Sequence, residues 1–224
     1  MLEPSIRENK IMSKKGLFIT VEGNEGSGKT TVIKRVLERL QKEKYNVAFS
    51  REPGGNKIAE SIRNIILDRS NVEMDPKTEA LLYAAARRQH LVQNILPLID
   101  SGTTILCDRY IDSSLAYQGY ARKIGIEEVY NINMFAIDNK LPDLTILFEI
   151  QPEIGLKRIS TNKDREINRL DVETIDFHHR VHMGYMLLSE RFSKRIVVIN
   201  AERPIEEVEE DVYKIIKKKM DSTN

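Results

Sequence analysis

Short apolar segments rich in β-branched residues alternate along the chain with longer segments of helical period. The apolar segments are 17–21, 46–50, 103–108, 144–150 and 195–200. Each is almost continuously apolar, as is typical of strands buried on both faces of a parallel sheet. The helical segments are 29–43, 56–68, 76–100, 111–121, 126–139, 152–161, 172–192 and 204–219. This alternation predicts an α/β fold with helices on both faces of the sheet and right-handed crossovers.

The pattern contains no repeat and no low-complexity linker, so we expect residues 14–224 to form a single domain. Residues 1–13 are polar and lack the apolar centre of a signal peptide. We interpret them as a flexible N-terminal leader, with Met12 as an alternative start. Residues 160–172 have little apolar content and no clear period, which favours a short loop or lid between two helices.

Composition narrows the class of protein. Lys and Arg (35) nearly balance Asp and Glu (34), so no global basic field points to nucleic acid. The single cysteine, Cys107, excludes an intramolecular disulfide and favours a reducing compartment. No apolar stretch approaches the roughly 18 residues that a membrane span requires. We therefore expect a cytoplasmic protein that binds neither membrane nor nucleic acid.

Residues 23–30, "GNEGSGKT", match the phosphate-binding pattern G-x4-G-K-[ST] and lie between a predicted strand and a predicted helix. Glycines let backbone N–H groups surround phosphates, and the helix N-terminus favours negative charge. We expect Lys29 to bridge the β- and γ-phosphates and Thr30 to reach Mg²⁺. The pattern predicts nucleotide binding by Gly23, Asn24, Glu25, Gly26, Ser27, Gly28, Lys29, Thr30 and Thr31.

An arginine and an acid stand side by side at the ends of two predicted strands. Arg51 and Glu52 follow one strand, and Asp108 and Arg109 lie at the end of the other. An aspartate at a strand end is where nucleotide-binding proteins of this class keep a carboxylate associated with Mg²⁺. The alternative is that Asp108 caps the next helix and that Arg51 and Glu52 only flank a turn. Two arginine–acid pairs beside the loop suggest that two phosphate groups are held.

Other charged and aromatic residues are ambiguous when taken alone. Tyr83 and Arg87 lie four apart on one helix face, where they could bind a base or be a core tyrosine and a surface arginine. Lys163, Arg165 and Arg169 could lie on a closing loop and neutralise charge on a transferred phosphoryl group, or they could belong to a solvated charged loop. His178 and His182 have a spacing compatible with zinc, but no third ligand is evident, so we assign them to a polar helix face.

Taken together, "EGNEGSGKTT", "REPGG", "YAAARRQH", "DRYIDSSLAYQGYAR", "PDLTILFEI" and "NRLD" resemble the bacterial form of thymidylate kinase. The resemblance runs from about Gly16 to the C-terminus. It implies a nucleoside monophosphate kinase fold with a five-stranded parallel sheet flanked by helices. It also implies the reaction ATP + dTMP → ADP + dTDP with Mg²⁺, and a homodimer.

The resemblance assigns roles residue by residue. Arg51 and Arg109 would clamp the acceptor phosphate, with Glu52 and Asp108 around the metal and its waters. Arg63 would help to hold the monophosphate, and Glu25 would meet the dTMP 3′-hydroxyl. Tyr83 would stack on thymine, and Arg87 would bond a thymine carbonyl. Ser114 and Gln118 would read the remaining polar edge of the base. Tyr117 would lie against the sugar and favour deoxyribose. Family members often have Phe at the position of Tyr83.

The phosphate-binding loop contains no cation between Gly23 and Gly28, whereas some family members carry a catalytic arginine there. The resemblance is therefore to the type in which lid arginines supply that charge. Arg165 and Arg169 are the candidates, and we favour Arg169. Catalysis would consist of aligning two phosphates and neutralising charge with Lys29, Mg²⁺, Arg109 and the lid.

Alternative functions leave different traces in a sequence. Another nucleoside monophosphate kinase would share Lys29 and Asp108 but would not need the base-reading set. A GTPase would need an N-K-x-D motif after a strand, and "NKLPD" (139–143) and "NKDR" (162–165) lack that context and spacing. A nucleic-acid-binding ATPase would need a basic face. A scaffold protein would not need paired arginine–acid strand ends.

Overall fold

The computed structural model describes residues 15–161 and 169–223. Five parallel strands form one sheet in the order β2-β3-β1-β4-β5. The strands are β1 (Phe18–Gly23), β2 (Val47–Arg51), β3 (Thr104–Asp108), β4 (Leu144–Glu149) and β5 (Ile196–Asn200). The predicted five-stranded parallel sheet is thereby confirmed. The proposed leader lies outside the described residues, as does 162–168 of the proposed lid.

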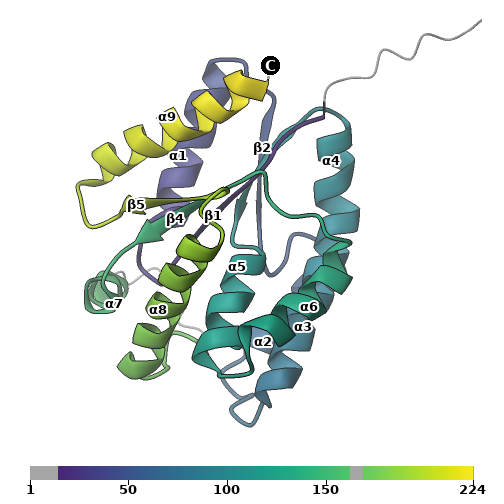
Figure 1. The fold of residues 1–224 in the computed structure, drawn as a ribbon, viewed down its shortest axis with the longest axis vertical. Coiled ribbons are helices and arrows are strands. Elements are labelled where there is room, and N and C mark those ends of the chain that lie inside the picture. The colour runs from purple at the N-terminus through teal and green to yellow at the C-terminus, as the bar shows by residue number, and fades with distance from the viewer. Residues whose placement is uncertain (1–14, 162–168, 224) are drawn as a thin grey trace, which may run out of the picture.

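Helices connect the strands and cover both faces of the sheet (Figure 1). The α-helices are α1 (Lys29–Lys42), α2 (Lys57–Leu67), α3 (Pro76–His90), α4 (Leu96–Asp100), α5 (Ile111–Ser114), α6 (Ile126–Ile137), α7 (Pro152–Thr161), α8 (Ile175–Arg191) and α9 (Ile205–Thr223). Two π-helical segments, η1 (Leu91–Ile95) and η2 (Leu115–Ala121), continue α3 and α5. The single helix expected over 76–100 is therefore divided, and Pro97, which lacks a backbone N–H, follows η1 closely.

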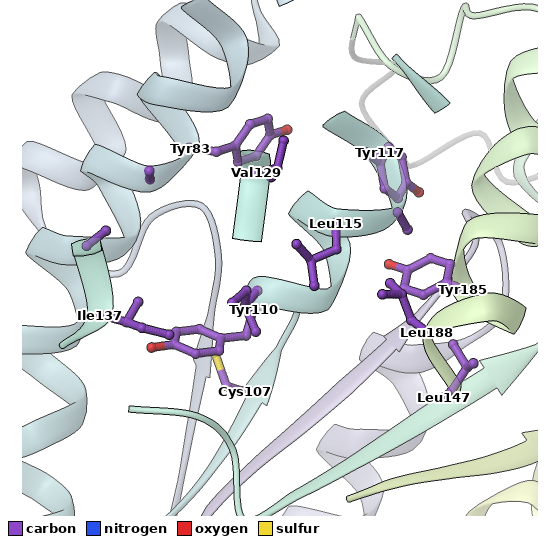
Figure 2. Close-up of a cluster of buried hydrophobic side chains, with 14 of the residues drawn as sticks. Tyr83, Cys107, Tyr110, Leu115, Tyr117, Val129, Ile137, Leu147, Tyr185 and Leu188 are labelled. Carbon is purple, nitrogen blue, oxygen red and sulfur yellow. The ribbon is translucent and has the colours of Figure 1, made fainter. Parts of the chain in front are cut away.

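Neighbouring residues of β1 point into different cores. Phe18 belongs to the core beneath α3, α5, α6 and α8, whereas Ile19 belongs to the core beneath α1 and α9. All six residues of β1 and all five of β3 are buried, which explains their largely apolar character. Figure 2 shows part of the first core, in which tyrosines from α3, η2 and α8 pack among aliphatic side chains.

Local side-chain bonds determine where several helices begin. Asn56 and Asp75 cap α2 and α3 by accepting backbone N–H bonds. The Thr174 side chain accepts from Phe177 N, so α8 begins at Ile175 rather than at 172. The expectation of a polar face for His178 was wrong, because α8 packs closely against η2 and leaves His178 only 2% exposed.

The sheet register brings the important strand ends together. Asp108 of β3 pairs with Val21 of β1 on one side and with Arg51 of β2 on the other. The phosphate-binding loop, the Arg51-Glu52 pair and the Asp108-Arg109 pair therefore lie at the same carboxyl edge, where ligands of such sheets bind. None of the helices in the described part of the chain combines the length and apolarity needed to cross a membrane.

Candidate active site

The loop between β1 and α1 has the backbone conformation of a phosphate-binding loop. Gly23, Gly26 and Gly28 all have positive φ, a region that glycine enters without a steric penalty. A Cβ atom on Gly26 would also overlap the carbonyl oxygen of Gly155, at the start of α7. The sequence pattern identified the loop, but Gly155, which lets α7 approach it, carried no recognisable motif.

Lys29 lies across this loop and is almost completely buried. Its Nζ donates to the carbonyl oxygens of Gly23 (2.9 Å) and Asn24 (2.8 Å) and to Ser27 Oγ (3.0 Å). Burial and the nearby Arg109 lower the pKa of Lys29 to about 8, against the opposing effect of nearby carboxylates. A phosphate oxygen would give this desolvated ammonium a charged acceptor.

Thr30 and Asp108 form the oxygen pair expected beside the phosphates. Thr30 Oγ1 donates to Asp108 Oδ2 at 2.5 Å, which joins the first turn of α1 to the end of β3. Among the described residues, no group of three or more His, Cys, Asp or Glu side chains is arranged to hold a metal. A hydroxyl and one carboxylate fit Mg²⁺, which usually keeps several waters and takes other ligands from substrate phosphates.

Arg109 is held in the cleft from several directions. It has a left-handed backbone conformation (φ 71°), which is costly for a residue with a side chain. Its Nη2 pairs with Glu25 Oε1 at 2.6 Å, and its Nη1 donates to Ser113 Oγ (3.1 Å) and Tyr185 OH (3.2 Å). Burial opposes the charge, but Glu25 and the neighbouring hydroxyls and carboxylates outweigh it and raise the pKa of Arg109.

The two arginines near the end of β2 line the cleft with their side chains partly exposed. Arg51 pairs with Glu60 at 2.9 Å, and both Arg51 and Arg63 donate to the carbonyl oxygen of Pro53. This shared contact places the two guanidinium groups close together. The structure thus brings a second concentration of positive charge to the cleft, as the resemblance implied.

Glu52 is arranged differently from the expectation. Its carboxylate is buried, with Oε2 bound to Arg87 Nε (2.8 Å) and Oε1 bound to His90 Nδ1 (2.9 Å). Both oxygens are therefore occupied by buried donors, which argues against the predicted role of Glu52 as a metal ligand. The geometry instead makes Glu52 a support for Arg87.

Arg87 is fixed by four different groups at the far end of the cleft. Besides Glu52, it donates to Ser114 Oγ (2.9 Å), to the Tyr110 carbonyl oxygen (2.9 Å) and to Asn133 Oδ1. A guanidinium has five N–H donors, so one donor remains to bind a ligand. Asn133 could not be anticipated from the sequence, because an asparagine within an amphipathic helix has no distinguishing pattern.

The predicted base-reading residues line one cleft with the phosphate-binding loop. Tyr83 and Arg87 come from α3, and Ser114, Tyr117 and Gln118 come from the end of α5 and from η2. Gln118 Nε2 donates to Glu79 Oε1 at 2.7 Å, and Tyr117 OH donates to Glu25 Oε1 at 3.1 Å. Irregular π-helical turns often occur at functional sites, and η2 follows that tendency.

Of the two candidate lid arginines, the structure describes Arg169 but not Arg165. Arg165 lies outside the described residues. Arg169 is buried. Its Nε donates a hydrogen bond to the Ile66 carbonyl oxygen (2.9 Å), and its Nη2 pairs with Glu79 Oε2 (2.5 Å). Glu79 also binds Gln118 and Arg122. Arg169 does not line the cleft in the described part of the chain, although Leu170 does. The structure therefore does not bring Arg169 to the predicted phosphate site.

The cleft has a volume of about 990 Å³, at the upper end of the range for small-molecule sites. Its lining joins the phosphate-binding loop to Tyr83 and Arg87, on the β2–β3 side of β1, and to Arg158 and residues 201–205, which follow β5 on the other side of β1. A cleft with two arms around one phosphate-binding loop has space for two ligands. Residues 201–205 belong to no motif in the sequence.

The sequence model of the thymidylate kinase family matches residues 21–212. The chain belongs to the thymidylate kinase family. It is 55% identical over 203 residues to the thymidylate kinase of Clostridium novyi (strain NT), covering 91% of this chain and 99% of that protein. It is 56% identical over 194 residues to that of Geobacillus sp. (strain WCH70), covering 87% and 92%.

A solved relative supports the same assignment at the level of structure. The crystal structure of thymidylate kinase from Ehrlichia chaffeensis superposes with a TM-score of 0.73 at 31% identity, covering 91% of this chain and 99% of that one. Membership of the family confirms the resemblance drawn from the motifs. The fold is accordingly the P-loop nucleoside monophosphate kinase fold. The individual roles of the site residues remain predictions.

Proposed function

We propose that this member of the thymidylate kinase family transfers the γ-phosphate of ATP to dTMP, giving ADP and dTDP for dTTP synthesis. The observation that carries the proposal is the single cleft that joins the phosphate-binding loop to Arg87 and Ser114. A nucleotide bound by the loop would face a second ligand whose base lies against Arg87. That is the arrangement needed for transfer between two nucleotides.

The donor side is formed by the loop and the first turn of α1. The backbone of 23–28 and Lys29 would hold the ATP phosphates, and the arm towards Arg158 and 201–205 has space for the rest of the nucleotide. Thr30 and Asp108 fit Mg²⁺ and would hold it. When bound, Mg²⁺ would neutralise negative charge on the phosphate oxygens.

The acceptor side is formed by the arginines and the base pocket. Arg109, Arg51 and Arg63 would bind the dTMP phosphate, while Glu25 and Tyr117 would contact the sugar. Tyr83 would stack on thymine, and Arg87, Ser114 and Gln118 would read its polar edge. Because these polar groups are buried, a base that fails to satisfy them would be rejected strongly. The acceptor is already an anion, so no strong general base is required.

The position of Arg169 changes the expectation for the lid. Because Arg169 is already bound to Glu79, we propose Arg165 as the arginine that neutralises charge on the transferred phosphoryl group. Arg169→Ala should lower the free energy of unfolding by about 1–3 kcal/mol and Tm by about 2–10 °C, because Glu79 loses a buried partner.

The discriminating measurement for the lid is kcat and Tm for Arg169→Ala beside Arg165→Ala. We expect kcat to fall further in Arg165→Ala, while Tm falls only in Arg169→Ala. A larger loss of kcat in Arg169→Ala, with its Tm unchanged, would instead assign the catalytic charge to Arg169.

The function itself is tested by ADP release with Mg-ATP and one monophosphate at a time. The acceptors are dTMP, dUMP, dCMP, dGMP, AMP and UMP. Turnover with dTMP far above the others is the expected result. Preference for a different monophosphate would keep the kinase and overturn the base assignments, and no turnover with any would leave only nucleotide binding.

We expect a homodimer, because the resemblance implies one. We also expect a cytoplasmic location, because the single cysteine favours a reducing compartment. Helices α2, α3 and α6 carry exposed apolar side chains, among them Ile65, Leu81 and Phe135, the last 88% exposed. We expect light scattering to give twice the chain mass, and Phe135→Asp to shift the mass towards one chain. A wild-type mass of one chain would contradict the dimer.

A further inference from the structure

Glu22 is a buried carboxylate in β1, one residue before the phosphate-binding loop. It is completely inaccessible to solvent and lies within a largely apolar strand. Nothing in the proposed chemistry uses it directly. A buried acid is costly unless several donors satisfy it, so the groups that bind it define what it does.

Three donors converge on this carboxylate. Tyr110 N donates to Oε1 at 2.7 Å, while Ser113 Oγ (2.6 Å) and Tyr185 OH (3.0 Å) both donate to Oε2. The donors come from the segment after β3, from α5 and from α8. Tyr185 is one of the core tyrosines in Figure 2. Glu22 thus gathers three segments directly behind the acceptor side of the cleft.

The same two hydroxyls also contact Arg109. Arg109 Nη1 lies 3.1 Å from Ser113 Oγ and 3.2 Å from Tyr185 OH, and it can only donate to them. Ser113 Oγ and Tyr185 OH also lie 2.9 Å apart, and either could donate to the other. Each hydroxyl has a single proton, for which Glu22 is the charged acceptor. When that proton points to Glu22, a lone pair remains to accept from Arg109.

We propose that Glu22 is a positioning residue for acceptor binding, because its carboxylate orients the Ser113 and Tyr185 hydroxyls so that both accept hydrogen bonds from Arg109. The inference rests on the proposed role of Arg109 at the acceptor phosphate. Glu25 holds the guanidinium on one side, and these hydroxyls fix it on the other. Arg109 is thereby oriented before the acceptor arrives.

Glutamine cannot reproduce this arrangement in either amide orientation. With its nitrogen at the Oε2 position, the side chain donates to both hydroxyls, and their protons turn away from it, towards the other hydroxyl or the cationic guanidinium. With its nitrogen at the Oε1 position, two donors oppose each other at Tyr110 N. The glutamate is therefore required for its charge and its acceptor capacity as well as for its shape.

The electrostatic surroundings of Glu22 give a second readout. Burial, together with the Asp112 carboxylate, raises the pKa of Glu22 to about 7, against the opposing effects of Ser113, Arg109 and Tyr110. Arg195 forms a two-bond ion pair with Asp112. Lys29, Cys107 and Tyr185 are also close enough to interact electrostatically with Glu22.

The sign of the resulting pH dependence follows from proton binding. Between the unfolded value of 4.5 and the folded value of about 7, the folded chain binds more protons than the unfolded chain. The contribution of Glu22 to the free energy of unfolding therefore falls as pH rises through that window. Glu22→Gln removes the effect, so its Tm relative to wild type should rise between about pH 5 and about pH 8.

The experiment, at a pH above about 7 where Glu22 is ionised, compares Glu22→Gln, the double variant Ser113→Ala/Tyr185→Phe, and the triple variant. Glu22→Gln should raise KM for dTMP about tenfold while leaving KM for ATP unchanged. The triple variant should match the double variant, because Glu22 acts through the two hydroxyls. Thr20→Val, which removes a buried hydrogen bond elsewhere on β1, is the matched control and should leave KM for dTMP unchanged.

A readout that needs no turnover separates this proposal from the proposed function. Resolved guanidinium NMR signals of Arg109, assigned with Arg109→Lys, should show hindered rotation in wild type and averaging in Glu22→Gln. Hindered rotation in both proteins, or additive KM effects in the triple variant, would overturn the positioning role. Absence of dTMP turnover in wild type would overturn the proposed function, and the NMR comparison would still decide the role of Glu22.

Discussion

Lys29→Met should lower kcat about 10³-fold, the loss typical when a desolvated charge-stabilising donor is removed from a transition state. The ammonium is buried and donates to three neutral oxygens, so a phosphate would give it a charged acceptor. Methionine keeps much of the volume of the side chain while removing the charge and all three donors. KM for dTMP should change little, because the acceptor phosphate is assigned to Arg109, Arg51 and Arg63.

The structure adds that Lys29 also supports the loop through the carbonyl oxygens of Gly23 and Asn24. We therefore expect Lys29→Arg to remain impaired, because a planar guanidinium needs more space than this buried site provides. Lys34→Met, on the exposed face of the same helix, is the matched control and should keep wild-type kcat. Steady-state kinetics with both substrates varied measures these effects, and kcat of Lys29→Met close to wild type would refute the assignment.

The part of the site that was predictable is the part encoded locally. Buried parallel strands are recognisable from uninterrupted apolar segments, and the residues after such strands gather at one edge of the sheet. Lys29, Asp108, Arg109 and Arg51 could therefore be placed near one another from the sequence. The resemblance added the base-reading residues on α3 and η2, which the structure places along the same cleft.

What could not be predicted depends on contacts between distant segments. The charge pattern of 160–172 does not reveal that Arg169 pairs with Glu79, which is 90 residues away. Similarly, the resemblance assigned Glu52 to the metal, but the packing of α3 turns its carboxylate to Arg87 and His90. Glu22 could have been noticed as an acid within an apolar strand, although its partners on α5 and α8 could not.

Arg87→Ala should impair binding and folding together. The sequence alone predicts mainly a higher KM for dTMP, and loss of a charged hydrogen bond to the base would raise it about 10- to 100-fold. The structure adds that Arg87 is 2% exposed and bound to the buried Glu52. Removing one partner of a buried ion pair costs about 3–5 kcal/mol, so Tm should fall by about 6–20 °C.

Two further variants separate these effects. Arg88→Ala is the matched control, because the neighbouring side chain makes a largely exposed pair with Asp138 and should change Tm little. Glu52→Gln in the Arg87→Ala background removes the buried charge that Arg87 balances in the wild type, and we expect it to recover part of Tm while KM for dTMP stays high. Thermal unfolding and steady-state kinetics test both expectations. Recovery of KM along with Tm would mean that Arg87 only maintains the pocket, whereas recovery of Tm alone would support its contact with the base.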